Sequence, residues 1–250
     1  MKRDLHLDKN EYFVINVFNP DTCKCDKQVT VYRLWEKDKQ GGFVESLDNI
    51  EAEGWVADNA IVAGNVTIAG HATVKDHAFV YGKGQILAYD DVVIAGDAYI
   101  VAGKESRIDI YNSAKIQGHA KVFGTDEQHI VICDASIIHE HALLYGDAGA
   151  WSTVVNKKEA IIGGDAIISN TNLVGLHVTK GVFQSTGDAC DKEEELLEHC
   201  YFGNDIQKLN ELSKTDIDFI DQVFKTFYGQ SFESYFGLGI SELDDDRELL

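Results

Sequence analysis

Histidine side chains recur in this sequence at spacings that could hold a metal ion or respond to pH. His77, Asp97, His119 and His141 follow one another at intervals of 20 to 22 residues, and His139 lies two residues before His141. Neutral imidazole is a common ligand of transition metals, and histidine titrates near physiological pH. His119, His139 and His141 are therefore candidate metal ligands. Exposed polar residues at the corners of a repeating fold would give the same pattern, so both interpretations stay open.

Cysteine usage indicates no disulfide framework. The five cysteines are an odd number and lie far apart, apart from Cys23 and Cys25. These two could ligate a metal ion, but no second cysteine pair accompanies them, and a hairpin turn is the simpler interpretation. A reducing cytoplasm is the compartment that this usage favours.

The charge of the chain restricts its partners. Asp and Glu number 42 against 22 Lys and Arg, a formal net charge of −20 over 250 residues. Such a surface disfavours direct binding to nucleic acid and to anionic membranes, and it suits a basic protein partner or simple solubility. We recognise no signal peptide and no transmembrane segment, because no apolar run is long enough.

A six-residue repeat organises the middle of the chain. Stepping by six from Ile50 meets only β-branched aliphatic residues: Ile50, Val56, Val62, Ile68, Val74, Val80 and Ile86. Four residues after each anchor stands a small residue in nearly every repeat. Two residues after each anchor, Gly and Asp are common, which suits a bend with positive φ. Because side chains alternate across a strand, the anchor and the small residue point to the same interior.

The spacing is interrupted three times and then resumes. The later anchors are Ile94, Ile100, Ile110, Ile116, Val122, Ile132, Ile138, Leu144, Ile162, Ile168 and Val174, giving 18 in all. We expect one interruption between Ile86 and Ile94. The other two, from Ile100 to Ile110 and from Val122 to Ile132, indicate inserted loops.

This pattern resembles the hexapeptide repeat of left-handed β-helix proteins. The entry segment Gly41-Gly42-Phe43-Val44-Glu45, followed by Trp55-Val56, is similar to a poorly characterised group of bacterial and prophage-associated hexapeptide-repeat proteins with a Gly-Gly-aromatic-Val-Glu entry. The resemblance covers residues 32–180 and implies an all-β, single-stranded, left-handed parallel β-helix of about seven triangular coils. We number its first, second and third faces from Ile50, Val56 and Val62.

The interruptions then predict a binding surface. Two of them follow the third face one coil apart, and the next coil leaves the same corner towards Trp151. We name the stacked loops the loop ridge. Loops that protrude from one side of a solenoid commonly form its binding face, although tolerated insertion would look the same. Its predicted binding residues are Lys104, Glu105, Arg107, Asp126, Glu127, His129 and Trp151.

Both ends of the repeat need caps, because terminal coils expose strand edges. Residues 12–17 and 29–34 are β-rich and flank Asn19-Pro20-Asp21, which predicts a hairpin cap within residues 1–48. The β-helix itself spans 49–180. From 190 to 250 helical spacing replaces the repeat, with segments 192–201 and 205–212 and a helix that a Thr215–Asp218 capping box begins.

The C-terminal region, 190–250, is acidic and aromatic. It holds 16 Asp and Glu against 5 Lys and Arg. Its aromatic residues suit either an internal helical core or a partner-binding surface. The acidic residues that we assign to binding are Glu193, Glu194, Glu195, Asp216, Asp218, Asp221, Asp244, Asp245 and Asp246.

Three functions are consistent with these features. The first is a non-catalytic binding protein without a cofactor. It would act through protein contacts of the loop ridge and acidic region, form homo-oligomers, and, given the resemblance, inhibit a host nucleic-acid-binding protein on behalf of a phage. The second is an acyltransferase that uses acetyl-coenzyme A, with His119, His129 or His141 as general base. The third is carbonic anhydrase-like zinc chemistry, which needs three converging histidines that the spacing does not establish.

Overall fold

The computed structural model describes residues 3–125, 127–146, 148–151, 159–184, 189–190 and 214–237. Its contacts divide the chain into two units, Met1–Asp205 and Ile206–Leu250, which we describe separately. No helix in the described part of the chain is long and apolar enough to cross a membrane.

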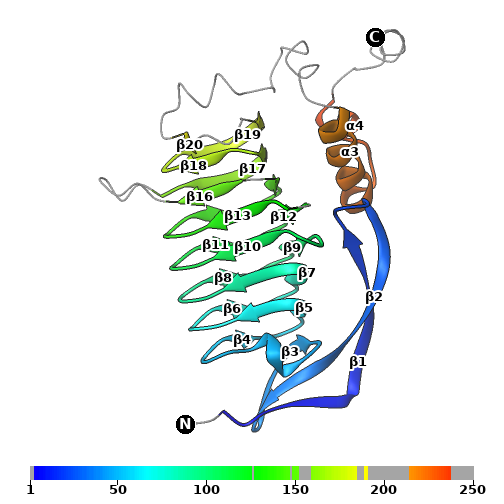
Figure 1. The fold of residues 1–250 in the computed structure, drawn as a ribbon, viewed down its shortest axis with the longest axis vertical. Coiled ribbons are helices and arrows are strands. Elements are labelled where there is room, and N and C mark those ends of the chain that lie inside the picture. The colour runs from blue at the N-terminus through cyan, green and yellow to red at the C-terminus, as the bar shows by residue number, and fades with distance from the viewer. Residues whose placement is uncertain are drawn as a thin grey trace. The chain divides into compact units, whose positions relative to one another are not determined.

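The first unit is a parallel β-solenoid of about six turns, against about seven predicted (Figure 1). The strands of successive coils pair in parallel along three faces. The first face holds β10 (Arg107–Ile110), β13 (His129–Ile132), β16 (Gly149–Trp151), β18 (Asn172–Val174) and β20 (Ala189–Cys190), with the ends of β5 and β7. The second face holds β4 (Trp55–Val56), β6 (Thr73–Val74), β8 (Val93–Ile94), β11 (Lys115–Ile116) and β14 (Ile137–Ile138), with the starts of β17 and β19. The third face holds β3 (Lys39–Val44), β5 (Ile61–Ile68), β7 (Phe79–Ala88), β9 (Tyr99–Ala102), β12 (Lys121–Gly124), β15 (Leu143–Tyr145), β17 (Ile161–Ser169) and β19 (His177–Gln184).

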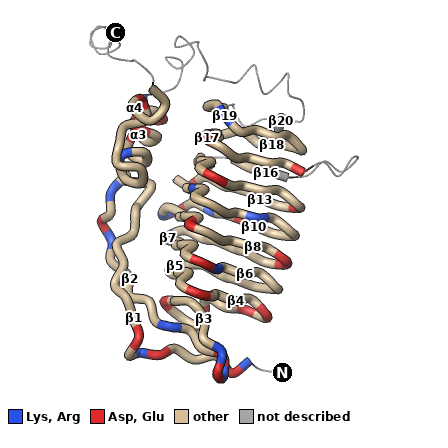
Figure 2. The backbone as a smooth tube through the Cα atoms, turned by 180° about the vertical axis from the view of Figure 1, so that it is seen from behind, with Lys and Arg blue, Asp and Glu red and all other residues tan. Residues whose placement is uncertain are grey.

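The repeat explains this winding. The predicted anchors line a single interior, and all except Ile50 and Val174 are fully buried. Position three forms the bends as predicted, with positive φ at Ala52, Asp58 and Asp76. Hydrogen bonds also link the bends of successive coils. The Asp58 carboxylate accepts a hydrogen bond from the Asp76 N–H, and the Asp76 carboxylate accepts one from the Gly96 N–H. Figure 2 shows such acidic positions recurring at the turns of the solenoid.

Two predicted anchors are wrong by one or two residues. Ile86 pairs with Val66, and Ala88 takes the place of an anchor beside Ile68. In the last coils, Leu173 pairs with Ala150 and is fully buried, whereas Val174 is half-buried. An inward position can hold Ala instead of Ile where side chains of the neighbouring coils fill the remaining space. The type of side chain alone therefore assigned the wrong residue to the inward position.

The corrected register moves the first interruption. It lies between Val80 and Ala88, not between Ile86 and Ile94. All three insertions therefore follow the third face, in three consecutive coils.

A long antiparallel hairpin precedes the solenoid. It consists of β1 (Leu5–Asn19) and β2 (Lys24–Glu36), and β2 continues antiparallel into β3. The base of the hairpin covers the first coil as predicted, because Leu34 belongs to the solenoid core and Leu5 and Leu7 pack against it. After β3, the short helix η1 (Leu47–Asn49) leads into the first full coil.

The hairpin does more than cap, because it continues along the third face (Figure 1). Arg33 holds its lower part in place, since its guanidinium donates to the carbonyl oxygens of Gly41 and Asp58 and lies 3.8 Å from the centre of the Phe43 ring. The tip of the hairpin reaches β7, β9 and β12, where it meets the loop ridge.

The described residues of the second unit, 214–237, form two helices, α3 (Lys214–Tyr228) and α4 (Phe232–Phe236). Helix α3 begins one residue before Thr215, so Thr215 lies inside the helix and does not cap it. Phe224 packs against Phe232, Tyr235 and Phe236 with ring centres 4.9–5.6 Å apart, which gives this unit the internal aromatic core that was one of two expectations. The predicted helices at 192–201 and 205–212 lie outside the described residues. The left hand of the solenoid and the three domain boundaries stay predictions.

Candidate functional site: the loop ridge and the hairpin tip

The loop ridge lies at the corner between the third and first faces. One loop contains Lys83 and connects the two halves of β7. The next contains Lys104 and Glu105 and connects β9 to β10, and the third contains Glu127 and connects β12 to β13. Because successive coils lie one strand spacing apart, about 4.8 Å, these insertions stack upon one another. The ridge therefore brings together charged residues that are about twenty positions apart in the sequence.

A cluster of three charged or titratable side chains forms the first-face side of the ridge. Arg107 and His129 are direct partners in the parallel register of β10 and β13. Asp109 follows Arg107 by two residues and so points to the same outer side. Its carboxylate lies 2.8 Å from Arg107 Nε and 2.9 Å from His129 Nε2.

Burial differs sharply within this cluster. The Asp109 side chain is 11% exposed, whereas Arg107 and His129 are 50% and 46% exposed. The carboxylate thus fixes two side chains whose outer parts remain accessible. The sequence prediction included Arg107 and His129 but missed Asp109, although the alternation of side chains along a strand could have found it.

Lys104 and Glu105 form the most exposed part of the ridge. Their side chains are 69% and 54% exposed and lie 3.2 Å apart. An exposed pair of this kind adds little stability, so both charges are available to a partner.

Asp21, at the tip of the hairpin, holds the ridge from the third-face side. Its carboxylate accepts a 2.9 Å hydrogen bond from the Lys104 backbone N–H and lies 3.7 Å from Lys83 Nζ. At Gly103 a Cβ atom would stand 2.0 Å from the same carboxylate, so only glycine allows this approach. Asp21 and Lys83 were not predicted as site residues, because nothing local in the sequence places a hairpin turn against a loop 80 residues later.

Aromatic packing also holds the tip of the hairpin against the third face. Phe18 is 1% exposed, and its ring centre lies 5.3 Å from that of Phe123. Its backbone N–H donates to the Tyr99 hydroxyl at 3.3 Å. Burial raises the pKa of Tyr99 well above its usual range, so the phenol stays neutral and remains part of an apolar contact.

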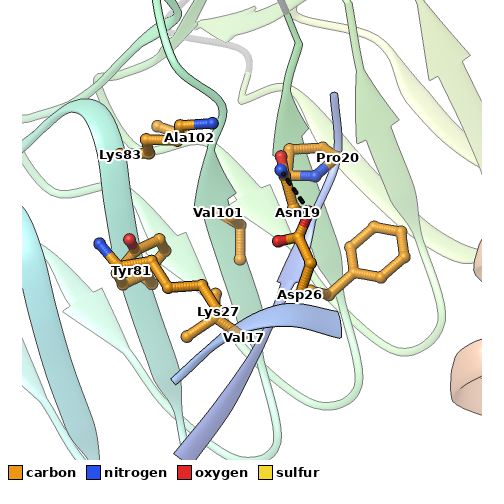
Figure 3. Close-up of a pocket in the computed structure, with 10 residues that line it drawn as sticks. Val17, Asn19, Pro20, Asp26, Lys27, Tyr81, Lys83, Val101 and Ala102 are labelled. Atoms are coloured by element: carbon orange, nitrogen blue, oxygen red, sulfur yellow. Dashed lines mark hydrogen bonds between the residues drawn. The ribbon is translucent and has the colours of Figure 1, made fainter. Parts of the chain in front are cut away.

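A recess of about 40 Å³, open to solvent, lies between the tip and the third face (Figure 3). Val17, Tyr81 and Val101 form apolar walls, and Lys27 and Lys83 supply positive charge. Asp26 lines the opposite side, where hydrogen bonds from Thr22 and Asn19 lower the pKa of its carboxyl group. The recess is small for a cofactor and suits a single side chain or a small polar molecule.

The other predicted ridge residues are placed differently. Glu127 is exposed on the ridge, and Asp126 lies outside the described residues. Trp151 ends β16 opposite Val174 on the first face, so it leads into the next corner and not into the ridge. The sequence misplaced it because the insertion after Trp151 belongs to the connection from the first to the second face.

Part of the acidic C-terminal region is described. Asp218 is exposed and Asp216 half-buried, both on α3. Asp221 has a structural role, because its carboxylate accepts the Phe232 N–H at the start of α4 and pairs with Lys225. Glu193, Glu194, Glu195, Asp244, Asp245 and Asp246 lie outside the described residues.

The histidine column forms at the corner between the second and third faces. His77 and His119 lie 3.9 and 3.4 Å from the Asp97 carboxylate, and the rings of His119 and His141 stack 5.2 Å apart. His139 lies 3.7 Å from the Glu140 carboxylate instead. Within the described residues, no three His, Cys, Asp or Glu side chains converge as metal ligands do. The metal interpretation therefore gains no support from the geometry.

Comparison of the chain with protein-family models, with curated proteins and with solved structures found no match. The resemblance to hexapeptide-repeat proteins therefore rests on the residues quoted for it.

Proposed function

We propose that this chain is a non-catalytic binding protein whose loop ridge and acidic C-terminal region contact a protein partner. One observation carries the proposal: the three insertions of consecutive coils all occur at one corner. The other connections in these coils keep the regular spacing of six between anchors. Insertions that stack at one corner form one continuous protruding surface, and such surfaces commonly bind partners in solenoid proteins.

The construction of the ridge supports the proposal. Asp21 and Phe18 hold the loops from one side, and Asp109 holds Arg107 and His129 from the other. A surface that is ordered before binding loses less conformational entropy when the partner arrives. Charged residues at such a surface contribute mainly to specificity and to the rate of association.

The partner that we propose is basic, since the chain carries a net charge of −20. A nucleic-acid-binding host protein, inhibited on behalf of a phage, is the finer version of this proposal. That version rests on the resemblance of the entry segment and on charge.

The test is affinity purification of the full-length chain from its native host, followed by identification of the co-purifying protein. The variants are Glu105→Lys and Glu127→Lys on the ridge, with Asp91→Lys as the matched control, because Asp91 is also exposed and precedes β8 on the second face. We expect the wild type and the Asp91 variant to recover the same basic protein, and each ridge variant to recover at least about tenfold less of it, because it places a positive charge against a basic partner. Equal recovery of the partner by all four chains would exclude the ridge as the binding surface.

The described residues offer no observation that favours the acyltransferase alternative. His129 Nε2 is held by Asp109, and no histidine lines the recess beside the ridge. We therefore do not propose it.

A further inference from the structure

Strand β1 has an open edge that carries exposed apolar side chains. In the described part of the chain its only strand partner is β2, across the register Leu5–Asn19. Tyr12, Phe13 and Val14 are consecutive and are 55%, 52% and 55% exposed, the largest exposures among the big apolar side chains described. A strand edge of this kind presents unpaired N–H and C=O groups together with apolar surface.

From Tyr12 to Val17 this edge carries none of the features that usually prevent strand addition. Proline, lysine and bulges protect edge strands in natural proteins. The register shifts of β1 lie on either side of this stretch, between Asp8 and Tyr12 and between Val17 and Phe18, and from Tyr12 to Val17 the pairing with β2 is continuous. No Pro or Lys occurs in that stretch.

Charge indicates a second copy of the chain as the partner of this edge. Between Lys9 and Glu36 the hairpin has four Lys and Arg and four Asp and Glu, so its formal charge is zero. The chain as a whole carries −20. Two copies would repel each other across most of their surfaces but not across the hairpin, since repulsion from charges beyond about 8 Å is screened in physiological salt.

The sequence of the edge is also complementary to itself. In an antiparallel pair with its twofold axis at Phe13, Tyr12 of each copy faces Val14 of the other, and Phe13 faces Phe13. Aromatic and β-branched residues form favourable cross-strand pairs. The run from Tyr12 to Val17 has no charged residue, so no like charges meet at the centre of this pair.

We propose that the chain forms a twofold homodimer in which the β1 edges of two copies pair antiparallel about Phe13. The two hairpins then form one four-stranded ribbon. This assembly is independent of the proposed function, because the central pairing residues Tyr12–Val14 lie outside the loop ridge and the recess beside it. A dimer would present two ridges to a partner, which raises the effective concentration of the second contact.

Sedimentation equilibrium of the full-length chain over a range of concentrations tests the proposal. Val14→Lys places a charge at the centre of the interface, and its side chain is exposed in the single chain, so folding should be retained. The matched control is Thr30→Lys, because Thr30 is the direct cross-strand partner of Val14 on β2. Circular dichroism confirms that both variants are folded.

We expect the wild type and the Thr30 variant to dimerise alike and the Val14 variant to dimerise at least about tenfold more weakly. A chain that stays monomeric at every concentration would overturn the proposal. So would a dimer that Val14→Lys leaves intact.

A disulfide test checks the register. In a chain with Cys23 and Cys25 changed to Ser, Phe13→Cys should cross-link two copies under mild oxidation, since the axis places residue 13 opposite itself. Asn16→Cys should not, because the axis at residue 13 places the two copies of residue 16 far apart. Efficient cross-linking of the Asn16 variant with none of the Phe13 variant would contradict the pairing.

Discussion

Lys121 is an amine on the outer side of the third face that is only 6% exposed. Its Nζ donates to the His119 carbonyl oxygen at 2.8 Å. Burial lowers the pKa of Lys121 to about 8, and the Asp97 carboxylate acts in the opposite direction. The side chain therefore opposes folding when it is charged, since the folded state binds its proton less tightly than the unfolded state does.

This depressed pKa predicts a change in the pH dependence of stability. The contribution of Lys121 should become more favourable as the pH rises from about 8, its pKa in the folded state, to the ordinary value of 10.5. The full effect is at most about 3 kcal/mol. Lys121→Met should therefore be more stable than the wild type at pH 7, and the difference should shrink towards pH 10.5. Urea denaturation of both chains across this range measures it, and a difference that does not vary with pH would show that burial does not control this amine.

At the level of single elements, the last coils provide a test of which residue of β18 points into the solenoid core. Leu173 is fully buried and Val174 is half-buried, although the six-residue spacing favoured Val174. Leu173→Ala should lower the free energy of unfolding by about 2–5 kcal/mol because it leaves a cavity. Val174→Ala should cost under about 1 kcal/mol. Thermal denaturation with matched urea titrations compares the two, and the reverse order would restore the register expected from the sequence.

The hairpin is the element that links the cap to the candidate site. Its base covers the first coil, while Phe18 and Asp21 at its tip contact coils several turns away. One element therefore contributes both to the protection of the terminal coil and to the order of the loop ridge.

At the level of the whole molecule, each coil of a solenoid contacts only its neighbours. A destabilising substitution in one coil should therefore affect mainly the stability of the adjacent coils. Ile100→Ala, in a fully buried position of the middle coil, should destabilise by about 2–5 kcal/mol. Hydrogen exchange should show the greatest loss of protection in β7, β9 and β12 and in the hairpin tip that packs on them. Protection near β4 should change less. Uniform loss along the chain would show that the coils open as a single cooperative unit.

The sequence alone determined the repeating part of this protein. Inward anchors, small residues and bends with positive φ follow from side-chain alternation and from the sterics of Gly and Asp, which act within a few residues. The same local rules indicated the hairpin and the helix near residue 215. They placed Arg107, Glu105 and His129 on one ridge because only the count between anchors was needed.

Only the tertiary structure decided what lies between coils and elements. The exchange of Ile86 for Ala88 depends on the volume that neighbouring coils supply, and Asp109 joins Arg107 and His129 through strands 22 residues apart. The position of Asp21 against Lys104 depends on the path of a hairpin with no local determinant of its direction. Non-local packing of this kind leaves no periodic signal in the sequence, and it is what gives the loop ridge its proposed rigidity.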